Sequence, residues 1–340
     1  MNIKRLAVDL AKDVFQLYGV DEQNKKVLEK RIKSRQKFVE FVTKVGPCEL
    51  VMEACGGANY WARKFKAMDY TVMLISPQHV KPYVHRNKND YRDVIAIMEA
   101  SFWSGVSFVT PKTVAQQDIQ SLLRIRKNYL DNRTAISNQI RGLMYEYGVT
   151  INVGYENLRS ALPTLYDRDE DNGLSTMMKE LIEGQYTMLL VIDEQIDTLD
   201  IRIKQQSSTN EICKRLQKIE GIGPISALAI IALVGDGKAF QNGRHFAAYL
   251  GLTPKQHSSG NRECMLGISK RGDGYLRELL VHGGRAVVRT SEKKTDPRSI
   301  WVNRIKNQGG FNKAAVAIAN KNARIVMSMI LSGDEYRKSA

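Results

Sequence analysis

Apolar and polar positions alternate along the first 108 residues in a way that predicts strands and helices in succession. Short apolar runs, some with period-two alternation, predict five strands, at residues 5–9, 14–18, 27–32, 50–53 and 71–75. Helical spacing instead predicts a helix over residues 36–45, with Phe38, Phe41 and Val42 on one face. Two further helices are expected, over residues 60–68 and from Asp90 to about Phe102.

The order of these elements predicts a particular sheet. Three successive hairpin-type strands followed by alternating helix and strand is the order of a ribonuclease-H-like fold, here expected as a mixed sheet over residues 1–110. Pro77 and Pro82 break the chain before the helix that begins at Asp90. We therefore expect an α/β domain at the amino terminus.

Residues 111–205 have a different, helical period. Apolar residues recur every seven positions at Leu122, Tyr129, Ile136 and Leu143, with Ile119 and Ile140 on the adjoining stripe. A second stretch places Ile192, Ile196, Leu199 and Ile203 at 4-3-4 spacing. Both patterns predict long coiled-coil-like helices, with a break at about 163–173, where Pro, Gly and Asp residues gather.

Residues 206–340 are expected to form a third, mainly helical domain. Gly221-Ile222-Gly223-Pro224 precedes an apolar helix over 225–234 and suits a helix-hairpin-helix turn, whose backbone N–H groups can hold a phosphate. The same tetrapeptide also suits any tight turn between helices. A polar, glycine-rich loop is expected around Ser258, Ser259 and Gly260, and again over residues 268–274.

Charge changes the picture by indicating a polyanionic partner. The 51 Lys and Arg exceed the 36 Asp and Glu by 15, and residues 255–340 alone hold 17 Lys and Arg against 7 Asp and Glu, a surplus of 10. Basic residues gain affinity for nucleic acid by displacing counterions from phosphates. Candidate nucleic-acid-binding residues on the first long helix are Arg124, Arg126, Lys127, Arg133 and Arg141. A solvated helix face is the alternative interpretation of that basic group.

The remaining composition narrows the class of protein. The four cysteines form no CxxC pair and the five histidines no HExxH motif, so neither a zinc site nor a disulfide framework is indicated. The amino terminus lacks the apolar core of a signal peptide, and no apolar run approaches the length of a membrane span. We expect a cytoplasmic, prokaryotic protein without a membrane partner.

Four acidic residues are the candidate chemistry. Asp9 and Glu53 each close an apolar run that predicts a strand, and Asp90 and Asp93 share one face of a predicted helix. Each alone is typical of a solvated or capping residue. Together they offer the oxygen ligands that Mg²⁺ prefers, and an Asp in a buried strand is costly unless its charge is compensated.

Six motifs in order carry a family resemblance. They are Ala7-Val8-Asp9, Met52–Gly57, Asn87–Asp93, Gly221–Pro224, Phe246–Pro254 and Ile268–Gly272. On these motifs the chain resembles, over nearly its whole length, the DEDD-type insertion-sequence transposases, a family that includes the Piv-type DNA invertases. At Gly267, directly before Ile268, the chain departs from the basic residue that the family pattern predicts.

The resemblance implies a function and a set of site residues. It implies a RuvC-like domain in which Asp9, Glu53, Asp90 and Asp93 hold Mg²⁺, with Mn²⁺ as a possible substitute. It also implies a C-terminal transposase domain in which Ser259 becomes joined to DNA, with Ser258 as the neighbour that could be confused with it. Lys270 and Arg271, together with Gly221 and Gly223, are then expected at nucleic acid.

Partners follow from the same resemblance and from the long helices. The resemblance implies double-stranded DNA at the element ends and the target, and a structured non-coding guide RNA. The coiled-coil-like helices, and the need to recombine two duplexes, favour a homodimer or homotetramer. Two other functions stay open: a RuvC-like endonuclease in which metal-activated water attacks the phosphate, and a non-enzymatic nucleic-acid-binding protein.

Overall fold

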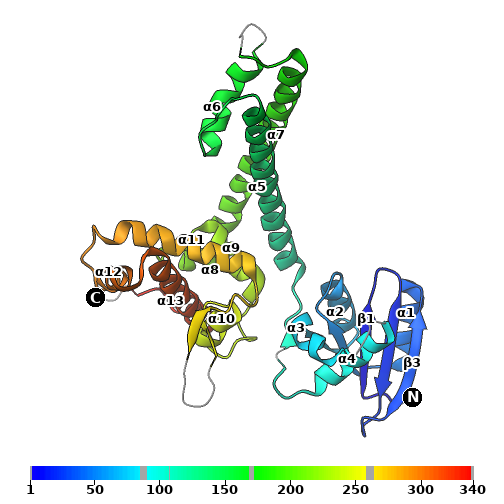
Figure 1. Ribbon diagram of the computed structural model, residues 1–340. Coiled ribbons are helices and arrows are strands. Elements are labelled where there is room, and N and C mark those ends of the chain that lie inside the picture. Colours follow the sequence, from blue (N-terminus) through cyan, green and yellow to red (C-terminus); the bar gives the residue numbers. More distant parts are fainter. Residues whose placement is uncertain (1, 85–89, 107, 168–171, 258–263, 338–340) are drawn as a thin grey trace. The chain divides into compact units, whose positions relative to one another are not determined.

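The structure is a computed structural model that describes residues 2–84, 90–106, 108–167, 172–257 and 264–337. The chain divides into two compact units, residues 1–115 and 116–340 (Figure 1). The second unit holds both the long helices and the C-terminal helices, which the sequence alone had suggested as separate domains.

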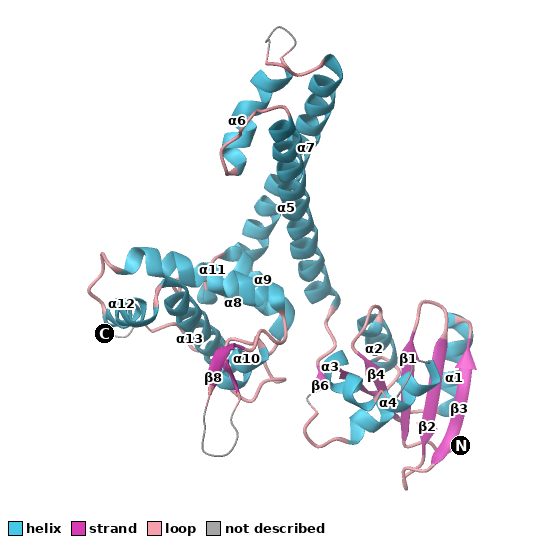
Figure 2. Ribbon diagram, viewed as in Figure 1, coloured by secondary structure: helices cyan, strands magenta, loops and turns pink. Residues whose placement is uncertain are grey.

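A mixed six-stranded sheet forms the centre of the first unit (Figure 2). Its strands are β1 (Arg5–Leu10), β2 (Phe15–Val20), β3 (Lys26–Ile32), β4 (Glu49–Glu53), β5 (Thr71–Ile75) and β6 (Phe108–Val109). Their order is β3-β2-β1-β4-β5-β6, in which β1, β4 and β5 are parallel and the other pairings antiparallel. The predicted mixed α/β sheet is confirmed, and β6 is an addition that the sequence pattern did not predict.

Helices cover both faces of this sheet. They are α1 (Arg35–Val45), α2 (Ala58–Lys66), α3 (Pro77–Val80), the 3₁₀ helix η1 (Lys81–Tyr83) and α4 (Asp90–Phe102). Side chains alternate along each strand, so Leu6 and Val8 of β1 pack under α1 and α2, whereas Ala7 packs with α4. The face of Ala7 is therefore the α4 face.

Two long helices and a shorter one begin the second unit. They are α5 (Val114–Glu146), α6 (Tyr155–Tyr166) and α7 (Thr176–Thr209). Ion pairs join α5 to α7, with Arg126 on Asp200 and, at 3.0 Å, Arg133 on Asp193. The predicted break at about 163–173 is confirmed in part, because α6 ends at Tyr166 and α7 begins at Thr176. It is wrong at Pro163, which lies inside α6, where Leu158, Leu162 and Leu165 pack in an apolar core.

The burial of the two predicted apolar stripes differs. Ile192, Ile196, Leu199 and Ile203 of α7 are all buried, as their spacing predicted. On α5, Leu143 is 37 % exposed, and the buried positions include Ile140 and Met144. The apolar seam of α5 thus follows the adjoining stripe, because α6 packs against that side.

Six helices and a hairpin complete the second unit. They are α8 (Glu211–Leu216), α9 (Pro224–Val234), α10 (Gly243–Tyr249), β7 (Pro254–Gln256), β8 (Met265–Ile268), α11 (Gly274–Ser291), α12 (Pro297–Gly309) and α13 (Phe311–Ser332). Among the described helices α13 alone is long and apolar enough to cross a membrane. It packs against α10, α11 and α12, and half of its most apolar stretch is buried, as in the core helix of a domain.

Two glycines fix the base of the β7–β8 hairpin. Gly251 and Gly272 have positive φ angles of 67° and 68°, and a Cβ on Gly272 would lie 1.9 Å from the Tyr249 carbonyl oxygen. Lys270 N donates to Gly251 O at 3.1 Å, and Ser269 N donates to Thr253 O. The motifs Phe246–Pro254 and Ile268–Gly272 are therefore joined by backbone hydrogen bonds. Ile268, expected in a loop, is the last residue of β8.

Candidate active site

Asp9 and Glu53 lie at the same edge of the sheet. In the parallel pairing of β1 with β4 the last matched pair is Val8 with Met52, and the two acids are the next residue on each strand. Both therefore point to the α4 face, as do Ala7 and Val51 two residues earlier. Each acid is half-buried.

The opposite ends of the same two strands carry opposite charges instead. Arg5 of β1 is paired in register with Glu49 of β4, and its Nε donates to the Glu49 carboxylate at 2.6 Å. Four residues further along, the matched positions are both acidic. The carboxyl edge therefore carries two neighbouring acids, a setting that suits a cation such as a metal ion.

Helix α4 runs with its amino end, which carries Asp93, toward this edge. Arg5 also donates to the Ser101 carbonyl at 3.1 Å, which fixes the carboxyl end of α4 at the amino end of β1. The amino end of α4 therefore lies toward the carboxyl end of β1. Asp93 is half-buried and shares its helix face with Ala96 and Ile97, which pack on the sheet. Asp90 begins α4, but its side chain lies outside the described residues.

Cys55 lies close enough to both strand acids to be affected by their charges. Its thiol is half-buried, and its Sγ lies 3.9 Å from the Leu10 carbonyl oxygen. Burial raises the pKa of this thiol, and the carboxylates of Glu53 and Asp9 raise it further. The Cys55 thiol therefore stays protonated near neutral pH.

These donors fit a hard divalent cation in kind. Mg²⁺ binds through one or two protein carboxylates and keeps room for water and phosphate, which two adjacent acids at an open sheet edge allow. Among the described side chains, no three His, Cys, Asp or Glu lie close enough to hold a metal ion. The described side chains of Asp9, Glu53 and Asp93 therefore do not form a three-ligand cluster, and the adjacent pair Asp9 and Glu53 is the part of the predicted site that the register brings together.

Ser258 and Ser259 lie outside the described residues. The last described rung of the β7–β8 hairpin joins His257 N to Cys264 O at 2.9 Å, directly before and after the stretch that contains both serines. Lys270 and Arg271, at the base of this hairpin, are exposed. Their predicted contact with nucleic acid stays a prediction.

Most of the basic residues predicted on α5 have partners inside the protein. Arg126 and Arg133 are in ion pairs with α7, Lys127 pairs with Asp131 one turn away, and Arg141 donates to the Gly154 carbonyl. Arg124 is exposed. Nucleic-acid binding by the paired cations would compete with the contacts that join α5 to its neighbours.

The predicted phosphate-binding turn between α8 and α9 is packed against α11. Gly221 has φ +88°, and its carbonyl oxygen would lie 1.9 Å from a Cβ on Gly283. Gly223 is exposed and precedes the first helical residue, Pro224. The turn therefore has a structural role at Gly221, while its Gly223 side faces solvent.

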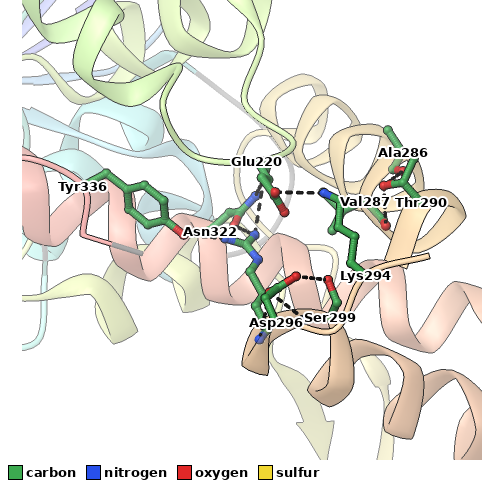
Figure 3. A network of polar contacts seen from close by, with 10 residues as sticks. Glu220, Ala286, Val287, Thr290, Lys294, Asp296, Ser299, Asn322 and Tyr336 are labelled. Atoms are coloured by element: carbon green, nitrogen blue, oxygen red, sulfur yellow. Dashed lines mark hydrogen bonds and ion pairs between the residues drawn. The ribbon is translucent and has the colours of Figure 1, made fainter. Parts of the chain in front are cut away.

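A buried polar network that sequence reasoning missed lies beside this turn (Figure 3). Arg298 is only 8 % exposed, and its guanidinium donates to Asn322 Oδ1 at 2.6 Å, to the Tyr336 hydroxyl at 3.0 Å and to the Glu220 carbonyl at 3.3 Å. Lys294 pairs with the Glu220 carboxylate at 2.9 Å. No sequence motif marked Arg298, because its partners are 24 to 78 residues away.

Comparison with known families gives two matches on this chain. Residues 6–149, which include the sheet and Asp9, Glu53, Asp90 and Asp93, match the DEDD family model of the IS110 type, described as Transposase. Residues 213–298, which include the α8–α9 turn and the β7–β8 hairpin, match the model described as Transposase IS116/IS110/IS902 family.

Curated relatives extend over nearly the whole chain. The chain is 46 % identical over 339 residues to the transposase for insertion sequence element IS1111A of Coxiella burnetii, covering 93 % of that protein. It is 33 % identical over 337 residues to the transposase for IS1328 of Yersinia enterocolitica, covering 99 % of that protein. A pilin gene-inverting protein of Moraxella bovis is 24 % identical over 68 % of this chain. The chain therefore belongs to the family of DEDD-type insertion-sequence transposases.

Proposed function

We propose that this transposase cuts and rejoins DNA at the ends of an insertion sequence, at a metal site built from Asp9, Glu53, Asp90 and Asp93. The observation that supports the site most is the register of β1 with β4, which places two acids side by side where the other end of the same strands has an acid and a base. A bound Mg²⁺, or Mn²⁺ in its place, would polarise the scissile phosphate and stabilise charge on the attacking and leaving oxygens.

Different residues of the chain are proposed to bind the cation and the DNA backbone. Asp9 and Glu53 hold fixed negative charge at one edge, and α4 adds Asp93 from the facing helix. The half-buried setting of these acids limits water around them, which strengthens their interaction with a cation. Basic residues elsewhere, such as the exposed Lys270 and Arg271, hold the DNA backbone.

We further propose Ser259 as the nucleophile, with a phosphoserine–DNA link as the intermediate. The hydroxyl oxygen of Ser259 bonds to phosphorus while the bond from phosphorus to the 3′ oxygen breaks. The serine proton passes to a base, and the departing 3′ oxygen takes up a proton. Membership of a DEDD family concerns the acidic residues and does not by itself imply a serine nucleophile, so this step needs its own test.

Double-stranded DNA, a structured guide RNA and a second or fourth copy of the chain are the proposed partners. The excess of 15 basic residues, spread over several segments, supports a large polyanionic ligand. The long helices α5 and α7 supply the surface for a homodimer or homotetramer. Copurified nucleic acid, identified by separate RNase and DNase digestion, tests the RNA directly.

Substitution of one acid tests the metal site. Asp9→Asn keeps the shape of the side chain but removes its charge, and should lower Mg²⁺-dependent nicking of element-end DNA by about 10³-fold, the rate equivalent of several kcal/mol. The matched control is Asp13→Asn, an exposed aspartate four positions further along. Equal nicking by wild type and Asp9→Asn would exclude the proposed site, whereas a wild type that binds but does not nick would favour the non-enzymatic binding function.

Denaturing electrophoresis of labelled DNA tests the serine. Wild type should give a protein–DNA band that resists SDS and is lost in Ser259→Ala, whereas Ser258→Ala should retain it. If Ser259→Ala cleaves as well as wild type, attack by metal-activated water, as in a RuvC-like endonuclease, replaces the serine step.

A further inference from the structure

A basic groove with an apolar floor runs along α13 in the second unit. Its volume is about 1310 Å³, larger than the roughly 300–1,000 Å³ of small-molecule sites. The floor includes Leu252, Ile268, Val316 and Ala317, contributed by the chain before β7, by β8 and by α13. The size suits a polymer segment better than a metabolite.

The charged residues that line this groove are all basic. They are Arg244 from α10 and Lys313, Lys321 and Arg324 from α13, and the lining contains no Asp or Glu. On α13, Lys321 and Arg324 lie 8 and 11 residues after Lys313, so the three cations follow one stripe of the helix. Within the described chain no ion pair neutralises any of the four.

Lys321 lies over an aromatic ring of the groove and near other cations. Its Nζ lies 4.5 Å from the centre of the Trp301 ring, which also lines the groove. Burial lowers the pKa of Lys321, and the guanidinium groups of Arg298 and Arg324 lower it further. A half-buried lysine beside other cations favours an anionic group of a ligand at this position.

We propose that this groove binds a single-stranded segment of the DNA substrate, with phosphates on the four cations and bases on the apolar floor. A duplex is contacted by an element that enters its groove, whereas unstacked bases need a concave apolar surface such as this one. The inference rests on the proposed DNA-cutting function, and DNA is chosen over RNA because β8 belongs to the hairpin that carries the proposed nucleophile.

The groove should be tolerant of base sequence. Two amide groups that line it are already used inside the protein: Asn242 Oδ1 accepts from the His245 backbone N–H, and Asn320 Nδ2 donates to the Leu252 carbonyl. Backbone charge and base burial then provide the affinity without reading base edges.

Fluorescence anisotropy with a labelled single-stranded DNA of about 12 nucleotides tests the groove in the full-length chain. Lys321→Gln/Arg324→Gln should weaken binding at least about tenfold and reduce the salt slope by about 1.4, two contacts at roughly 0.7 each. The control Arg202→Gln/Lys204→Gln removes two exposed cations of α7 and should change binding less. EDTA in the buffer removes divalent metal and so separates strand binding from metal chemistry.

A gain of affinity gives a second, independent readout. Gly267 lines the groove on β8, and a Cβ there would meet no atom within 4 Å. Gly267→Lys should therefore add a phosphate contact and steepen the salt slope by about 0.7. The proposal is overturned if the α13 double variant binds DNA as well as its control, or if it loses affinity only for the single-stranded RNA of the same sequence.

Discussion

At the scale of single residues, the β1–β4 pair has different charge at its two ends. Arg5 and Glu49 neutralise each other at one end, while Asp9 and Glu53 meet at the other. Their alignment was predictable from sequence because each acid follows an apolar run that had to be a buried strand. The buried network of Arg298 was not predictable, because its partners Asn322 and Tyr336 come close only in the folded chain.

The buried cysteine Cys213 provides a residue-scale prediction about pH. Burial raises the pKa of its thiol from 9.0 to about 12, so between these values the thiol is ionised in the unfolded chain and protonated in the folded one. Its contribution to stability is full below pH 9 and is lost as the pH rises toward 12. Urea unfolding at pH 8 and pH 10.5 should therefore show a smaller loss of stability in Cys213→Ala than in wild type.

The exposed cysteine Cys264 is the control for that measurement. Cys264→Ala should follow the wild-type pH dependence. A Cys213→Ala profile that parallels wild type between pH 8 and 10.5 would contradict the argument.

At the scale of elements, long periodic segments were predictable and short exposed ones were not. The helix expected from Asp90 to about Phe102 and the strand over 71–75 have the expected bounds. The strands β6, β7 and β8 were missed because they have two to four residues and largely exposed side chains, which leave no apolar alternation. Pro163 was misread because apolar packing of α6 outweighs the loss of one backbone hydrogen bond.

Two glycines in helices give a matched prediction at this scale. In Gly284→Ala the new Cβ would lie 2.3 Å from the Ala315 carbonyl oxygen, so α11 and α13 must separate, at a cost of about 1–3 kcal/mol. Gly184 of α7 has no atom within 4 Å of the corresponding position. Gly184→Ala should therefore stabilise the protein by about 0.5–1 kcal/mol.

Chemical denaturation of both variants measures these effects. A Gly284→Ala as stable as wild type would contradict the close packing of α11 on α13, and a destabilised Gly184→Ala would contradict the open space beside that position of α7.

At the scale of the whole molecule, the two units have separate apolar cores. The core clusters of the sheet use residues 3 to 109, and those of the helical unit use residues 119 to 336. The sequence predicted a boundary at about residue 110, and the described chain divides after Ala115. The sequence did not predict that α5 and α7 share a core with the C-terminal helices. Leu123 of α5 and Ile203 of α7 lie in that core, but their contacts are with residues distant in sequence.

Independent cores predict an independently folding fragment. Residues 1–115 expressed alone should give mixed helix and strand signals in circular dichroism and a single cooperative thermal transition. A fragment without near-ultraviolet signal or a cooperative transition would mean that the sheet depends on the helical unit.

The central claim, that the acids at the carboxyl edge of β1 and β4 hold a divalent metal, is tested most directly by Mn²⁺ titration followed by electron paramagnetic resonance. Wild type and Asp13→Asn should take up Mn²⁺ with the same affinity, and Asp9→Asn should bind it at least about tenfold more weakly. Equal Mn²⁺ binding by wild type and Asp9→Asn, or an equal loss in Asp13→Asn, would contradict the claim.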